Sequence, residues 1–164
     1  MRGIKWFITG LVVAMLVGLT AAACDVEHNS PELVAKAYVN AASKIDYGEI
    51  IECSDYEGEY KKATALNAAE ALVNYYISMI PDEAKAELKT YKFKSYEKLD
   101  GQIVEETKET QSGEKIVITE TETGKITVTY KEDGKGETLE RDLIMIFVKV
   151  DGKWYLGIES LISL

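Results

Sequence analysis

The hydrophobic pattern of this 164-residue chain changes its period near Lys89, and that change limits the fold more than any other feature. Before Lys89, apolar residues recur every three or four positions, which is typical of helices with one covered face. After Lys89, apolar and polar residues alternate, which is typical of half-buried strands. Helices first and an antiparallel meander of strands afterwards predict an α+β fold.

The helical half begins with a clear start signal. Ser30 is predicted as the N-cap, with Pro31 at the first helical position and Glu32 in the first turn. One apolar stripe follows, formed by Leu33, Val34, Ala37, Tyr38, Ala41 and Ile45. Further along we predict a short helix over 49–53, a polar and aromatic loop over 54–60, a long helix over 61–80 and one or two turns over 83–88.

Dipeptides that favour hairpin turns divide the second half into short strands. We predict turns at Asp100-Gly101, Ser112-Gly113, Thr123-Gly124 and Asp151-Gly152, and a wider turn over 133–136. The strands between them are predicted over 91–94, 103–110, 115–121, 125–131, 143–150 and 154–158. The strand from Leu143 to Val150 is apolar on both faces, which favours a central position covered by helices.

Residues Met1 to Cys24 form a separate segment with the pattern of a secretory signal peptide. Arg2 and Lys5 precede an uncharged run that ends in small residues. Its exit, Ala21-Ala22-Ala23-Cys24, resembles the bacterial lipobox, in which a diacylglycerol joins the cysteine thiol and the preceding peptide is removed. An uncleaved membrane-spanning helix is the alternative. The closing small residues favour cleavage.

This leader predicts both the domain organisation and the location. We expect a signal peptide over 1–23, a lipidated tether over 24–29 and a single domain over 30–164, which is an ordinary domain size. The attached lipid, palmitate included, would hold the protein at the extracytoplasmic face of the cell membrane. The formal net charge of −9 repels phosphate backbones and disfavours nucleic acid as a partner.

Residues that serve nucleophilic and metal chemistry are scarce in the chain. The single histidine, His28, lies in the predicted tether, which disfavours a Ser-His-Asp or Cys-His site. The two cysteines are Cys24, assigned to lipid, and Cys53, for which we predict burial as a small apolar residue. Zinc sites usually need several such ligands. We therefore predict no metal and no cofactor.

Two segments of the chain carry a family resemblance. The run Ser-Pro-Glu-Leu-Val-Ala-Lys-Ala-Tyr-Val-Asn-Ala over 30–41, followed by Lys44-Ile45-Asp46-Tyr47, resembles the start of small bacterial lipoproteins in the cystatin-like nuclear transport factor two superfamily. The closing Val150-Asp151-Gly152-Lys153-Trp154-Tyr155 resembles the final hairpin of that group. The resemblance spans roughly 30–164 and implies a curved sheet wrapped around helices with a conical cavity. It also implies that dimers through the sheet occur.

Members of that superfamily include isomerases and cyclases as well as many non-catalytic domains. The isomerases use a cavity carboxylate and a tyrosine, which here implies Tyr38 with Asp55 or Asp46. Tyr76 and Trp154 are the other residues expected to line a cavity. The simpler interpretation is that Tyr38 is a core residue and that Asp46 bonds backbone amides beside its turn.

The glutamates of the strand region also have two interpretations. Interleaved with Thr and Lys, they predict a solvated sheet face that opposes edge-to-edge aggregation, or a docking surface for a cationic partner or for divalent ions; they are Glu105, Glu106, Glu109, Glu120 and Glu122. We therefore assign no catalytic residue. The leading hypothesis is a non-catalytic domain that binds a small molecule or an envelope protein, and the alternative is an isomerase-type or cyclase-type enzyme.

Overall fold

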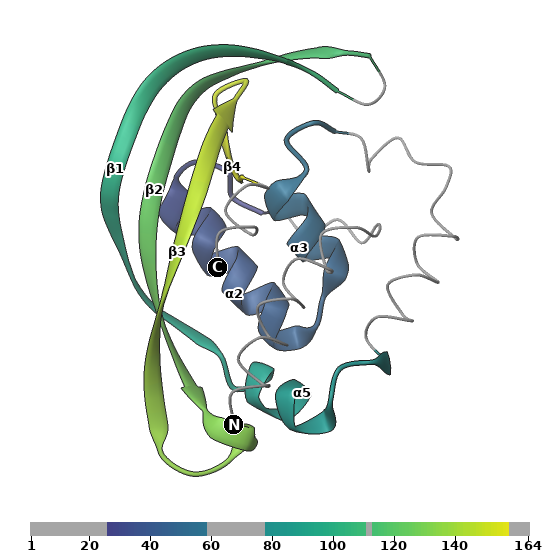
Figure 1. Cartoon of the computed structure of the whole chain (residues 1–164), viewed down its shortest axis with the longest axis vertical. Coiled ribbons are helices and arrows are strands. Elements are labelled where there is room, and N and C mark those ends of the chain that lie inside the picture. Colours follow the sequence, from purple (N-terminus) through teal and green to yellow (C-terminus); the bar gives the residue numbers. More distant parts are fainter. Residues whose placement is uncertain (1–25, 59–77, 111–112, 158–164) are drawn as a thin grey trace.

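The computed structural model describes residues 26–58, 78–110 and 113–157 (Figure 1). In these ranges the strands form one antiparallel sheet in the order β1-β2-β3-β4. The sheet is strongly curved, and the helices lie on its concave side (Figure 1). The predicted α+β class is confirmed at this level.

The elements follow one another in the order that the sequence predicts. The helices come first: α2 (Pro31–Lys44), α3 (Tyr47–Ser54) and α5 (Asp82–Leu88). The strands and one short 3-10 helix follow: β1 (Lys92–Glu109), β2 (Lys115–Lys131), η3 (Glu132–Gly134), β3 (Thr138–Val150) and β4 (Lys153–Leu156).

Helix α2 begins as its sequence predicts. The Ser30 hydroxyl oxygen accepts a hydrogen bond from the Leu33 N–H at 3.3 Å, and Pro31 is the first helical residue. The helix ends at Lys44, and its C-cap residue, Ile45, has a φ of 58°, which lies in the left-handed region. That conformation is unusual for a β-branched residue. It turns the chain sharply enough for α3 to begin two residues later.

The buried face of α2 is wider than the predicted stripe. The buried residues are Pro31, Val34, Ala35, Tyr38, Val39, Ala41 and Ala42, whereas Leu33 and Ala37 are only partly buried. The reason is that α2 packs on two sides, against the sheet and against α3. A single stripe of the predicted width would cover only one of these neighbours.

The other helix predictions have different outcomes. The short helix predicted over 49–53 is confirmed as α3, and Cys53 is fully buried as expected. The turns predicted over 83–88 are confirmed as α5. Most of the long helix predicted over 61–80, including Tyr76, lies outside the described residues.

Two of the predicted hairpin turns are wrong. Strand β1 continues through Asp100-Gly101, and β2 continues through Thr123-Gly124, so the predicted short strands merge into longer ones. Both glycines make room for neighbouring side chains. A Cβ at Gly124 would lie 2.3 Å from a ring carbon of Tyr96, and one at Gly101 would lie 2.7 Å from Nζ of Lys98.

The curvature of the sheet originates in β1. Relative to β2, this strand gains a residue at three places, between Phe93 and Ser95, between Lys98 and Asp100, and between Ile103 and Glu106. Such bulges bend a strand and increase its twist. They also interrupt the regular pairing edge that a long outer strand would otherwise offer to another chain. The bulges thus account for the arc that β1 follows in Figure 1.

The turns on either side of β3 agree with their dipeptide signals, whereas Ser112 of the predicted Ser112-Gly113 turn lies outside the described residues. Asp151 and Gly152 have φ values of 50° and 76°, as a two-residue hairpin turn between β3 and β4 requires. Asp133, Gly134 and Gly136 also have positive φ in the wider turn.

Strand β3 is central, and it is covered on both faces along only part of its length. Val148 and Val150, on the face opposite Phe147, are buried in a second hydrophobic cluster with Tyr56 and Ile118. Met145 and Phe147 are buried against the helices, whereas Ile144 is 40% exposed. No helix covers the convex side of β3 in the ranges that the structure describes (Figure 1). The predicted two-sided burial therefore holds near Val148 and Val150, whereas the part of the strand around Ile144 is covered on the concave face alone.

A pair of glycine substitutions tests the contact between η3 and α5. A Cβ at Gly134 would lie 2.8 Å from the Ala86 carbonyl oxygen, whereas a Cβ at Gly136 would meet nothing within 4 Å. Both glycines have positive φ, which costs an L-residue roughly 1–2 kcal/mol. We expect Gly134→Ala to lower the free energy of unfolding clearly more than Gly136→Ala does. Urea denaturation measures both, and equal losses would contradict the close approach.

Candidate functional site

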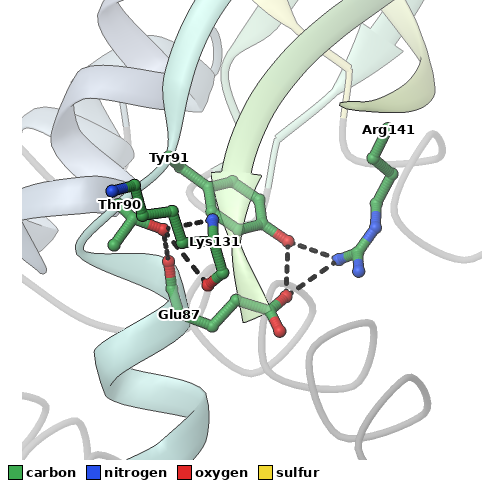
Figure 2. A network of polar contacts seen from close by, with 5 residues as sticks. All are labelled: Glu87, Thr90, Tyr91, Lys131 and Arg141. Carbon is green, nitrogen blue, oxygen red and sulfur yellow. Dashed lines mark hydrogen bonds and ion pairs between the residues drawn. The ribbon is translucent and has the colours of Figure 1, made fainter. Parts of the chain in front are cut away.

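The first candidate site is a polar network where α5 meets the sheet (Figure 2). Glu87, in the last turn of α5, is only 4% exposed. Its Oε1 accepts a hydrogen bond from the Tyr91 hydroxyl at 3.2 Å and lies 3.3 Å from Nη1 of Arg141 on β3. Arg141 also donates to the Tyr91 hydroxyl oxygen. The three side chains therefore form a closed triangle, which we call the Glu87 network.

Aromatic rings hold the cation of this network in place. The Cζ of Arg141 lies 4.3 Å from the centroid of the Tyr130 ring, and the Tyr91 and Tyr130 centroids are 5.6 Å apart. A guanidinium over a ring face is attracted by the ring quadrupole. Arg141 is thus fixed both by a carboxylate and by a ring.

Thr90 links the same region through the backbone. Its hydroxyl donates to the Glu87 carbonyl oxygen at 2.6 Å and accepts from the Lys131 N–H at 2.8 Å. The end of α5 is thereby joined to the end of β2, as the dashed lines in Figure 2 show. Together these contacts fasten α5 to the sheet.

The second candidate site is the Glu122 cluster, formed by Tyr96, Lys98 and Glu122 on the concave side of the sheet. The Tyr96 hydroxyl donates to Oε1 of Glu122 at 2.6 Å, and Nζ of Lys98 lies 2.6 Å from Oε2. Gly101 is the cross-strand partner of Glu122, and Gly124 leaves space for the Tyr96 ring. The two glycines therefore make this cluster possible.

The position of Glu122 corrects the prediction that the strand glutamates form one solvated face. Glu122 is only 8% exposed, because it lies on the concave side and its oxygens are engaged by the cluster. Glu105, Glu106 and Glu109 are exposed as expected. Glu120 is partly exposed and forms an ion pair with Lys149 at 2.5 Å.

The phenols of both sites are held in the neutral form. Burial is the main factor that raises the pKa of Tyr91 and of Tyr96 above the usual range, and a neighbouring glutamate raises each further, although the charge of Arg141 lowers the pKa of Tyr91 in part. Burial likewise raises the pKa of Tyr38. Tyr91 and Tyr96 therefore donate their hydroxyl protons to Glu87 and Glu122 at neutral pH.

The residues that the sequence suggests as cavity lining are mostly core residues. Tyr38 and Trp154 are buried in the main hydrophobic cluster. The Lys149 Nζ lies 5.4 Å from the Trp154 ring centroid. Tyr76 and the proposed lipidation residue Cys24 lie outside the described ranges. Tyr38 and Trp154 thus fill the interior between the sheet and the helices.

The two candidate aspartates lie in different surroundings. Oδ1 of Asp46 accepts a hydrogen bond from the Glu49 N–H at 3.2 Å, which caps α3 and confirms the simpler interpretation of this residue. Asp55 is buried after α3, and its charge raises the pKa of Tyr155, an effect second to that of burial. Among the described residues, carboxylates and phenols lie within hydrogen-bond distance in the pairs Glu87 with Tyr91 and Glu122 with Tyr96.

Sequence reasoning missed both of these pairs. The spacing of four residues between Glu87 and Tyr91 across the end of α5 is a usable signal. The pair of Glu122 and Tyr96 depends on the register between β1 and β2. That register could not be inferred while Gly101 and Gly124 were interpreted as turn residues.

Searches for a metal site and for a membrane-spanning helix in the described part of the chain, and for related proteins, gave no match. Among the described residues, no group of three or more His, Cys, Asp and Glu is placed to hold a metal ion. Of the helices that the structure describes, none has the length and apolar character needed to cross a membrane. No family model, curated protein or solved structure matches the chain.

The neutral tyrosines predict a loss of stability at high pH. An unfolded tyrosine has an ordinary pKa of 10.0, whereas folding raises the pKa of Tyr38 above it. Stability from this residue is therefore complete below about pH 10 and is lost as the pH rises towards the folded-state pKa, by about 1.4 kcal/mol per pH unit for each such tyrosine. We expect the free energy of unfolding, measured with urea, to fall above about pH 10. Tyr38→Phe should reduce that slope, and an unchanged slope in this variant would contradict the assignment.

Proposed function

We propose that this protein is a lipoprotein, held at the extracytoplasmic face of a bacterial cell membrane through acylated Cys24, and that its folded part is a non-catalytic binding or interaction domain. The observation that carries the proposal is the leader, in which basic residues, an uncharged run and small residues precede Cys24. Acyl chains contribute ~0.8 kcal/mol of membrane affinity per buried methylene. The membrane attachment then needs no surface of the domain itself.

The interior supports a non-catalytic role. A general base must be free to accept a proton from a substrate. Glu87 accepts from Tyr91 and pairs with Arg141, and Glu122 is held by Tyr96 and Lys98. Each carboxylate is thus engaged by a phenol and by a cation. Glu87 joins α5 to β3, and Glu122 joins β2 to β1.

The curved sheet supports the resemblance to the cystatin-like superfamily. Its strands are antiparallel, and α2 packs against the concave side, as such a cone requires. The ligand in this proposal is a small molecule or an envelope protein, and nucleic acid is disfavoured by the net charge of −9. Pairing of two copies through the sheet belongs to the same proposal.

One observation favours the enzymatic alternative. Tyr96 and Glu122 are a phenol and a buried carboxylate 2.6 Å apart, the combination used in isomerase-type proton transfer. Lys98 would have to leave Glu122 before that carboxylate could accept a proton. The Lys98 side chain is 59% exposed, so it can turn away without unpacking the core.

A substitution at the proposed lipidation residue tests the anchor. We expect Cys24→Ser to abolish incorporation of labelled palmitate and to leave the protein either unprocessed or released from the membrane fraction. Cys53→Ala is the matched control, because the buried Cys53 is predicted to play no part in acylation. Unchanged palmitate labelling of the Cys24→Ser variant would contradict the proposal.

A further inference from the structure

The segment that the sequence assigns to the tether lies against the folded domain. Val26 is 8% exposed and belongs to the main hydrophobic cluster. The His28 carbonyl oxygen accepts a hydrogen bond from the Trp154 N–H at 2.9 Å, and Nδ1 of His28 lies 2.6 Å from the Trp154 carbonyl oxygen. The His28 ring also lies 4.4 Å, centroid to centroid, from the ring of Tyr155. Residues 26–28 therefore pack beside β4.

This docking shortens the free part of the chain between the lipid and the domain. Two residue steps separate Cys24 from Val26, and they span at most ~7 Å. The acylated residue must therefore lie within ~7 Å of a residue that is fixed on the domain. A tether of this reach leaves the domain little freedom to rotate away from the bilayer.

We propose that the domain is held directly against the lipid headgroups, with β4 and the docked residues 26–28 nearest to the bilayer and η3 farther from it. This inference rests on the proposed acylation of Cys24. Strand β4 and η3 lie toward opposite ends of the long axis of the molecule (Figure 1). A partner in the envelope would then approach the end that carries η3, α5 and the Glu87 network.

In this orientation the surface around β4 contacts the phospholipid headgroups. The short link of two residue steps between Cys24 and Val26 favours this contact, because it ties the surface covalently to the lipid. The charge of the protein is net negative, so zwitterionic headgroups are the appropriate test surface.

Fluorescence quenching from the headgroup region tests this orientation. The lipidated full-length protein is reconstituted in phosphatidylcholine vesicles that contain a lipid with a spin-labelled headgroup. A fluorophore is placed on Lys153→Cys, next to the docked segment, or on Glu132→Cys in η3; both native side chains are exposed. Cys53 is fully buried and stays unlabelled. We expect the label at position 153 to be quenched several-fold more strongly than the label at position 132.

A longer linker is the matched control. An insertion of about eight Gly and Ser residues between Asp25 and Val26 adds a flexible reach of roughly 16 Å. We expect this insertion to reduce the difference between the two labels while the protein still floats with the vesicles. Equal quenching without the insertion, or a difference that the insertion leaves unchanged, overturns the orientation alone. Failure to float with the vesicles overturns the lipid anchor and the orientation together.

Discussion

The bend of the outer strand is the constraint on which the rest of the structure depends. Three extra residues in β1 curve the sheet, and the helices occupy the concave side that this curvature creates. The same bend places Tyr96 and Lys98 over Glu122. A carboxylate buried in this way is stable only when it is paired and hydrogen-bonded. The curvature and the Glu122 cluster are therefore parts of one arrangement.

Glu87 acts in the same manner where α5 meets the sheet. Glu87 connects α5 to β3 through Arg141, and Thr90 connects it to β2. Both sites consist of a carboxylate, a neutral phenol and a cation, all supplied by the chain itself. An interior stabilised in this way is consistent with the proposed non-catalytic role of the domain. The docked His28 adds to this view, because it turns the expected tether into part of the domain.

The sequence predicts the elements of the fold better than their pairing. The start of α2 at Ser30 and the turn at Asp151-Gly152 follow from local signals, since capping and positive φ depend on neighbouring residues. The glycines at positions 101 and 124 misled the strand prediction, because their role is to accommodate side chains across the sheet. The burial of Glu122 depends on the same register, which no local pattern determines. For this reason the sequence did not reveal the pair of Glu122 and Tyr96, whereas the pair of Glu87 and Tyr91 was missed although its spacing of four residues is a local signal.

The central claim is that buried carboxylates hold the elements of this domain together, and a double-mutant cycle at Glu87 and Arg141 tests it most directly. Arg141→Met should lower the free energy of unfolding by about 3 kcal/mol, because Glu87 is left buried without its cation. Glu87→Gln in the same background should restore part of that loss, with a coupling energy of at least about 1 kcal/mol. Effects of the two substitutions that add within about 0.3 kcal/mol would contradict the account.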